Sequence, residues 1–130
     1  MKFKFKVVTP YGIKFEEDID RIQIRTTSGE IGVLANHINL VTEVKISVLR
    51  IHNDDTVKEF AISDGILYVK DKETVLIVNS AEFKEDIDFE RASRAKERAS
   101  LRLEKKDKNL DVARAEAALA RALNRLSLKQ

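Results

Sequence analysis

The sequence contains no cysteine and no tryptophan, and it has only one proline, four glycines and two histidines. Without cysteine the chain has no disulfide, iron–sulfur cluster, thiol nucleophile or cysteine-ligated zinc site. His37 and His52 are too few for a typical histidine metal site. No run approaches the ~18 apolar residues of a membrane-spanning helix, and the start Met-Lys-Phe-Lys-Phe-Lys alternates, unlike a signal peptide. These absences predict a soluble intracellular protein without catalytic chemistry of its own.

The residues that are present divide the 130-residue chain into two parts of different composition near residue 85. All four glycines, the proline and every aromatic residue except Phe89 come before that point. Nine of the twelve alanines and seven of the ten arginines come after it. The net charge is −1 up to Lys84 and +3 from Glu85 onward. The sequence therefore predicts two structural units, 1–84 and 85–130.

The first unit has the alternating pattern of half-buried β-strands. Phe3, Phe5 and Val7 alternate with lysines, so that one face is apolar and the other is charged. Similar runs cover Ile19–Arg25 and Val44–Ile51, and turn-forming residues separate the runs. No helical pattern lies between them. The predicted fold class is α+β, with an N-terminal antiparallel β-sandwich followed by helices.

The second unit has the pattern of two helices. Asp88 is placed to cap the first, which is expected to end near Lys105, and Asp111 or Asn109 caps a second that ends near Leu126. The polar connection over residues 106–109 is short, which predicts an antiparallel two-helix hairpin. Apolar residues, most of them alanine, recur every three or four positions and form one narrow seam along each helix: Ala92, Ala95, Ala99 and Leu103, then Ala115, Leu119, Ala122 and Leu126. Such a seam buries little area, so the hairpin is expected to dock, open or extend.

Arginines flank the seam on both helices. The first helix carries Arg91, Arg94, Arg98 and Arg102, and the second carries Arg114, Arg121 and Arg125. A turn near Lys108 places Arg91 opposite Arg125, and Arg98 about one turn from Arg121. Guanidinium groups converging beside a helix N-terminus favour a phosphate compound. The spacing alone leaves three interpretations open: a site for a phosphate compound, a surface for nucleic acid or acidic lipid, and a solvated basic face with interspersed glutamates.

Two glycine-containing segments of the first unit are similar to those of a known family. Thr26–His37 and Ala61–Val69 resemble the loop signatures of the epsilon subunit of F-type ATP synthase. Their order and spacing, and the Ala/Arg-rich hairpin that follows, extend the resemblance over essentially the whole chain. Two residues depart from the family pattern, because Ala35 stands where proline is common and Asp64 where a second glycine is usual.

The resemblance implies a non-catalytic rotor subunit, peripheral to the cell membrane on its cytoplasmic side. The β-sandwich, 1–84, would bind the gamma subunit and rest on the polar loops of the c-ring, with Glu30 and His37 at that contact. The hairpin, 85–130, would reach the alpha/beta catalytic head when extended and inhibit ATP hydrolysis.

Some bacterial members carry an ATP-binding motif, Ile/Leu-Asp-x-x-Arg-Ala, at the base of the hairpin. Ile87, Asp88, Arg91 and Ala92 match it. Such members also use a preceding glutamate, matched by Glu82, and later arginines, matched by Arg98, Arg121 and Arg125. The resemblance therefore implies ATP as a regulatory ligand that is not hydrolysed, with the role of magnesium open. The motif pattern occurs again at Leu110–Ala115, at the start of the second helix. This repetition makes the motif less specific as evidence for an ATP site.

The main alternative function is a small RNA- or nucleic-acid-binding adaptor with a basic hairpin. Gly29-Glu30-Ile31-Gly32 has the GxxG spacing of the KH-domain loop that clamps a nucleic-acid backbone. That loop joins helices, whereas strand-like segments flank this one. The net charge of +2 also disfavours a dedicated nucleic-acid binder.

Overall fold

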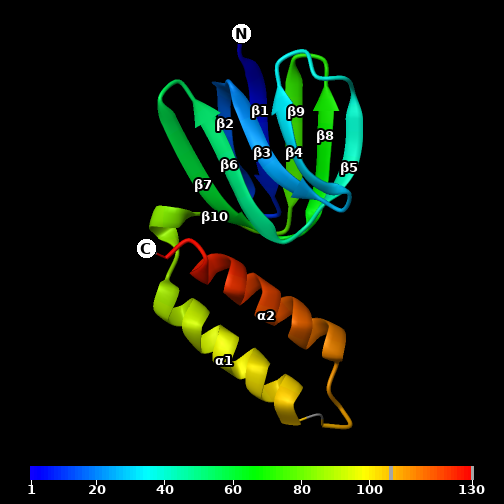
Figure 1. Cartoon of the computed structure of the whole chain (residues 1–130), viewed down its shortest axis with the longest axis vertical. Coiled ribbons are helices and arrows are strands. Elements are labelled where there is room, and N and C mark those ends of the chain that lie inside the picture. Colours follow the sequence, from blue (N-terminus) through cyan, green and yellow to red (C-terminus); the bar gives the residue numbers. More distant parts are fainter. Residues whose placement is uncertain (106, 130) are drawn as a thin grey trace. The chain divides into compact units, whose positions relative to one another are not determined.

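The computed structural model describes residues 1–105 and 107–129 as two compact units, Met1–Phe83 and Lys84–Gln130. The first unit contains ten strands: β1 (Phe3–Thr9), β2 (Gly12–Ile19), β3 (Arg21–Thr26), β4 (Gly29–Leu34), β5 (Leu40–Val44), β6 (Ser47–Asn53), β7 (Thr56–Ile62), β8 (Gly65–Lys70), β9 (Glu73–Val78) and β10 (Ala81–Phe83). The second unit contains a short 3-10 turn (Lys84–Asp86) and two helices, α1 (Phe89–Lys105) and α2 (Val112–Leu126), drawn in Figure 1. The predicted α+β class is confirmed.

The strands form one hydrogen-bonded path, β10-β7-β6-β3-β5-β8-β9-β1-β2, with β4 paired to β3. The path folds over on itself, because the Phe15 ring of β2 packs edge-on against the Phe60 ring of β7, with centroids 5.9 Å apart. An ion pair between Lys58 and Glu17, 3.3 Å long, also joins these two strands. Every pairing is antiparallel except that of β1 with β9, which is parallel. The resulting sandwich therefore has a mixed sheet.

The first strand, β1, has one buried apolar face and one charged outer face, as predicted. Phe3, Phe5 and Val7 are buried, and Phe5 and Val7 are fully enclosed. On the outer face, Lys4 and Lys6 both pair with Glu16 of β2, at 3.2 and 3.5 Å. Burial of Phe3, Phe5 and Val7 contributes most of the stability of this strand, because exposed ion pairs such as those of Glu16 contribute little.

Two predicted runs were longer than the strands that form. The run Ile19–Arg25 is interrupted at Asp20, where β2 ends and β3 begins. The run Val44–Ile51 is divided by a bend at residues 45 and 46, between β5 and β6. Alternation continues through both bends, and β5 and β6 both pair antiparallel with β3, so they run the same way. The hydrophobic period therefore does not mark where one strand ends and the next begins.

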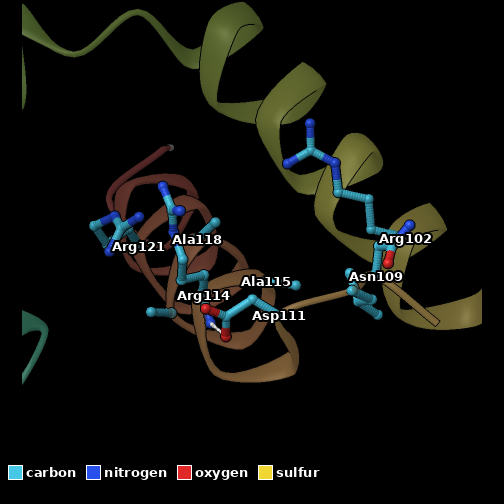
Figure 2. Close-up of a pocket in the computed structure, with 9 residues that line it drawn as sticks. Arg102, Asn109, Asp111, Arg114, Ala115, Ala118 and Arg121 are labelled. Carbon is cyan, nitrogen blue, oxygen red and sulfur yellow. Dashed lines mark hydrogen bonds between the residues drawn. The ribbon is translucent and has the colours of Figure 1, made fainter. Parts of the chain in front are cut away.

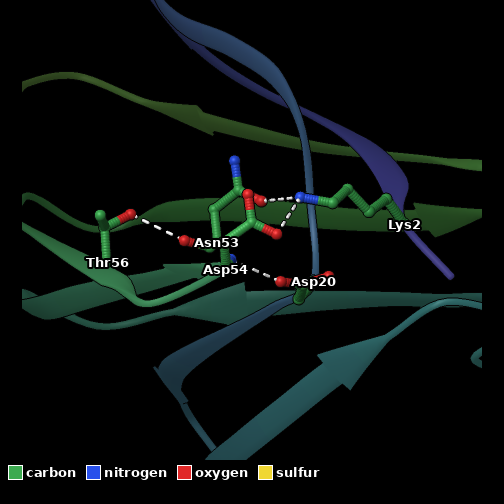
Figure 3. Close-up of polar contacts among 5 residues, drawn as sticks. All are labelled: Lys2, Asp20, Asn53, Asp54 and Thr56. Carbon is green, nitrogen blue, oxygen red and sulfur yellow. Dashed lines mark hydrogen bonds and ion pairs between the residues drawn. The ribbon is translucent and has the colours of Figure 1, made fainter.

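One end of the sandwich is held by a polar cluster around the β6–β7 turn (Figure 3). The Lys2 ammonium donates to the Asn53 side chain and to Asp54, the latter at 3.0 Å. The Asp54 backbone N–H donates to the Asp20 carboxylate at 2.7 Å. Hydrogen bonding to Asp54 is the main cause that raises the pKa of Lys2. The cluster ties the start of β1 to two turns that lie far away in the sequence.

His52 occupies a position on β6 that favours its neutral form. Its Nδ1 accepts from the Arg21 guanidinium at 3.4 Å, and its Nε2 donates to the Gln23 side chain at 2.8 Å. Burial, followed by the charges of Arg21 and Arg50, lowers the pKa of His52 below its ordinary 6.5. A second proton on the ring would face a guanidinium group instead of a hydrogen-bond acceptor.

The helices begin and end where the sequence predicts. Asp88 accepts from the Arg91 backbone N–H at 3.0 Å, and Asp111 accepts from the Arg114 N–H at 3.1 Å. Asp111, not Asn109, is therefore the cap of α2. Residues 107–109 of the predicted connection precede this cap, and Lys106 lies outside the described residues. Neither helix has the length and apolar character needed to cross a membrane, among the residues described.

Four alanines of the predicted seam are buried. The four most enclosed hairpin alanines are Ala92, Ala99, Ala115 and Ala122, with exposed fractions of 4, 2, 4 and 0%. The other four seam residues are half-buried. Small side chains thus form the centre of the helix–helix contact, and the seam prediction is confirmed.

Candidate functional site

The base of the hairpin carries the Ile87–Ala92 motif in a defined local structure. Ile87 and Ala92 are buried, with exposed fractions of 7 and 4%, whereas Asp88 and Arg91 are exposed. Asp88 caps α1 through the Arg91 amide, as described above. The Arg91 guanidinium has no hydrogen-bond or ion-pair partner within residues 1–105 and 107–129. The motif thus presents one carboxylate and one available guanidinium at the start of a helix.

The remaining predicted ligands are distributed along the structure. Arg125 lies in the last turn of α2, and the antiparallel helices put that turn at the same end of the hairpin as Arg91 (Figure 1). Arg98 is exposed near the middle of α1, and Arg121 is half-buried on α2. Glu82 is half-buried in β10 and belongs to the other compact unit.

A cavity of about 590 Å³ lies at the turn end of the hairpin. It is lined by Arg102 of α1, by the segment Asn109–Asp111, and by Arg114 and Arg121 of α2, together with Ala115, Ala117 and Ala118. Figure 2 shows the three arginines extending from the two helices, with the Asp111–Arg114 cap at the start of α2. Arg121 is the one predicted ligand that lines this cavity. Arg114, which the interpretation of the sequence did not include among the ligands, occupies the arginine position of the duplicated motif.

The chemistry available on the hairpin is that of anion binding. The guanidinium groups of Arg91, Arg98, Arg102, Arg114 and Arg121 have no hydrogen-bond or ion-pair partner among the residues the structure describes. Within the same residues, no group of three or more His, Asp or Glu side chains is placed to hold a metal ion. Guanidinium groups donate charge-assisted hydrogen bonds, which suit phosphate oxygens.

The sandwich places Glu30 and His37 apart. Glu30 is exposed at the start of β4, next to the β3–β4 turn, where the Thr27 N–H donates to the Glu43 backbone carbonyl oxygen at 3.1 Å. His37 follows the other end of β4 and is half-buried, with its Nδ1 2.7 Å from the Ile38 carbonyl oxygen. Glu30 is the second residue of β4, a strand of six residues and about 20 Å, and His37 lies three residues beyond the end of that strand. They do not share one loop tip, in contrast to the interpretation of the sequence.

A row of apolar side chains crosses the outer face of four strands. Ile66 of β8 pairs with Ile77 of β9, Ile77 pairs with Val8 of β1, and Val8 pairs with Ile13 of β2. Ile66, Ile77 and Ile13 have exposed fractions of 38, 46 and 56%. Paired residues project to the same face of a sheet, so these four side chains form a continuous apolar row, called the outer row below.

Comparison with known proteins covers both units. Residues 2–84 match the model of the ATP synthase delta/epsilon chain beta-sandwich domain, and residues 85–130 match that of the delta/epsilon chain long alpha-helix domain. The chain belongs to the ATP synthase delta/epsilon family. The resemblance on which the interpretation of the sequence relies is therefore confirmed, and the GxxG spacing lies in the β3–β4 hairpin of this family, not between helices.

Curated members of the delta/epsilon family are similar along nearly their whole length. The ATP synthase epsilon chain of Bacillus licheniformis is 41% identical over 125 residues, which cover 96% of this chain and 95% of that one. The epsilon chain of Caldicellulosiruptor bescii is 41% identical over 129 residues, covering 99% and 94%.

Solved structures also include members with this fold. A chain of the Euglena gracilis mitochondrial ATP synthase, in a structure of its OSCP, F1 and c-ring, superposes with a TM-score of 0.81 at 25% identity. The match covers 92% of this chain and 76% of that chain. A chain of the Tetrahymena thermophila central stalk and c-ring has the same fold, with a TM-score of 0.61 at 15% identity over 98% and 93% of the two chains.

Proposed function

We propose that this chain is the non-catalytic epsilon subunit of the central stalk of a bacterial F-type ATP synthase. In this proposal the sandwich stays on the rotor, while the hairpin binds ATP when folded and inhibits ATP hydrolysis when extended. The observation that carries the regulatory part is the alanine seam, because it holds the hairpin closed with little buried area.

The strength of the seam decides whether a ligand can control the hairpin. Four buried alanine methyl groups contribute about 3 kcal/mol at ~0.8 kcal/mol each. A ligand that binds only the closed form adds RT ln(1 + [L]/Kd), or about 2.7 kcal/mol at 100 times Kd. The ligand contribution is of the same size as that of the four buried alanines. A ligand at about 100 times its Kd therefore shifts the balance toward the closed state substantially.

The motif at the base of the hairpin is the proposed nucleotide site. Arg91, Arg98, Arg121 and Arg125 donate to the phosphates or ribose, and Glu82 and Asp88 accept hydrogen bonds from the base or sugar. Ile87 and Ala92 supply apolar contact to adenine. These roles follow from the family resemblance, and the cap geometry at Asp88 supports them because it orients the Arg91 backbone at the start of α1.

Calorimetric titration of the full chain with ATP, with and without magnesium, tests the nucleotide site. Arg91→Ala is expected to weaken ATP binding at least tenfold, since it removes a charge-assisted donor, whereas Arg94→Ala on the same helix leaves the affinity unchanged. Asp88→Asn retains an acceptor for the cap and removes the charge. Its matched control is Asp111→Asn, which alters the equivalent cap of α2. Equal ATP affinity in wild-type, Arg91→Ala and Asp88→Asn proteins would reject this site.

The outer row is the proposed contact surface for the gamma subunit. Its exposed isoleucines form an apolar strip across four strands, and strips of this kind on a small domain mark protein contacts. Ile77→Asp is expected to abolish co-purification with gamma. The control is Val57→Asp, because Val57 is also exposed, at 52%, but lies on β7. Retention of gamma by the Ile77→Asp variant would exclude this face.

Glu30 is the proposed polar contact to the c-ring loops, in preference to His37. The carboxylate is exposed next to a turn and lacks a hydrogen-bond or ion-pair partner in the described part of the chain, whereas the His37 ring contacts its own backbone. A cysteine at position 30 is expected to cross-link to a cysteine in a c-ring loop more efficiently than one at position 37. The reverse order would assign the contact to the opposite end of β4.

Deletion of residues 85–130 separates the roles of the two units. The sandwich alone is expected to retain gamma and the c-ring, because its core lies entirely within residues 3–81. ATP hydrolysis by the assembled complex should rise when the hairpin is absent. Loss of gamma binding by the truncated chain would contradict this division of roles. Because the sandwich is proposed to contact the c-ring, the chain is expected to be attached peripherally to the cytoplasmic side of the cell membrane.

A further inference from the structure

The turn end of the hairpin has its own set of positive charges. Arg102 approaches the cavity from α1, and Arg114 and Arg121 approach it from α2. None of the three guanidinium groups has a hydrogen-bond or ion-pair partner among residues 1–105 and 107–129. The single carboxylate in the lining belongs to Asp111, which accepts from the Arg114 backbone N–H. The lining therefore has a net charge of +2, and its donors are available to a ligand.

The position of these arginines follows from helix geometry. Arg114 and Arg121 are seven residues apart, or nearly two full turns, so they project from the same face of α2. Arg102 lies in the last turns of α1, which the hairpin places beside the start of α2 (Figure 1). Like charges are gathered here from two helices around a cavity of about 590 Å³, and an anion would relieve their mutual repulsion.

The cavity is separate from the base of the hairpin. Arg91 and Arg102 are eleven residues apart on α1, which corresponds to about 16 Å along the helix axis. Of the residues proposed above to bind ATP, Arg121 alone lines the cavity. Arg102 and Arg114 belong to the cavity and to no part of the proposed nucleotide set.

We propose that this cavity is a second anion site, which takes a phosphoryl anion and joins the two helices at their turn. Arg102, Arg114 and Arg121 donate to its oxygen atoms. Because the donors come from both helices, a bound anion stabilises the closed hairpin, and it shares only Arg121 with the proposed ATP ligands. The same phosphoryl chemistry is available from a free inorganic anion and from the phosphate tail of a nucleotide, and the experiment separates these sources.

The test is a titration of the full-length protein with inorganic pyrophosphate at constant ionic strength, followed by amide chemical shifts. Addition is expected to move the Arg114 and Ala115 amides and to leave the Arg91 and Ala92 amides in place. Arg102→Ala and Arg114→Ala are each expected to weaken pyrophosphate binding about tenfold. Arg91→Ala, which belongs to the nucleotide site, and Arg94→Ala, the matched control, are expected to bind as the wild type does.

Three outcomes would overturn the proposal. The first is an absence of shifts at millimolar pyrophosphate. The second is an equal loss of affinity in Arg94→Ala, which would indicate a general basic surface. The third is a loss in Arg91→Ala as large as that in Arg114→Ala, which would mean one site occupied by the nucleotide tail. Failure of ATP binding together with pyrophosphate binding that depends on Arg114 would reject the nucleotide site and retain this one.

Discussion

Replacing Ala122 by leucine tests whether the alanine seam controls closure of the hairpin. Ala122 is fully buried on α2, and three further seam alanines have exposed fractions of 4% or less. Added methylene groups in a packed contact cost about 1–3 kcal/mol. The four buried alanine methyl groups contribute about 3 kcal/mol, so the substitution offsets a third or more of that contribution. The ratio of closed to open hairpin is expected to fall about 5- to 150-fold.

Native-state hydrogen exchange measures this ratio residue by residue. Amides of α1 and α2 in the Ala122→Leu variant should exchange faster by the same factor, whereas amides of the sandwich core should be unchanged. Ala120→Leu is the matched control, since Ala120 is exposed on the same helix and leucine is nearly as good a helix former. Equal protection of both variants and the wild type would show that the seam does not hold the helices together.

Three further predictions concern the sandwich. Phe60→Ala should lower the free energy of unfolding by about 3–5 kcal/mol in chemical denaturation, because this ring is fully buried; a change below 1 kcal/mol would contradict its place in the core. Gly65→Ala should lower the melting temperature, because a Cβ there would lie 2.0 Å from the Ile77 carbonyl oxygen, whereas Gly32→Ala meets nothing closer than 3.8 Å and should have a smaller effect. The lowered pKa of His52 means that protonation favours the unfolded chain, so stability should be fully present above about pH 6.5 and decrease as the pH falls; His52→Gln should remove this component from the pH dependence of unfolding.

The helical unit shows how far sequence reasoning extends. The limits of both helices, the two caps and the buried seam are as predicted. Each depends on residues at most a few positions apart, because capping and the 3.6-residue period are local properties. The nucleotide-binding residues remain a prediction from the family resemblance. Spacing along the sequence does not predict whether Glu82 of β10 and the arginines of the hairpin act together.

Features that depend on the course of the chain in three dimensions could not be predicted from the sequence. The breaks at Asp20 and at residues 45 and 46 are hidden in continuous alternation, because the side-chain period persists through a bend between two strands. The cavity at the turn end joins Arg102 to Arg114, and the sequence placed these residues only on two basic faces. Glu30 and His37 are close in the chain but lie at opposite ends of a strand.

The sequence by itself determined the two-part organisation, the alternating core of the first strand, and the hairpin with its alanine seam and arginine faces. Composition and short-range periodicity are sufficient for these features, since they arise from interactions between near neighbours. The tertiary structure decided the parallel pairing of β1 with β9, the outer row assembled from four strands, and the arginine-lined cavity. Each of these brings together residues far apart in the chain, so it depends on pairings that local patterns do not specify.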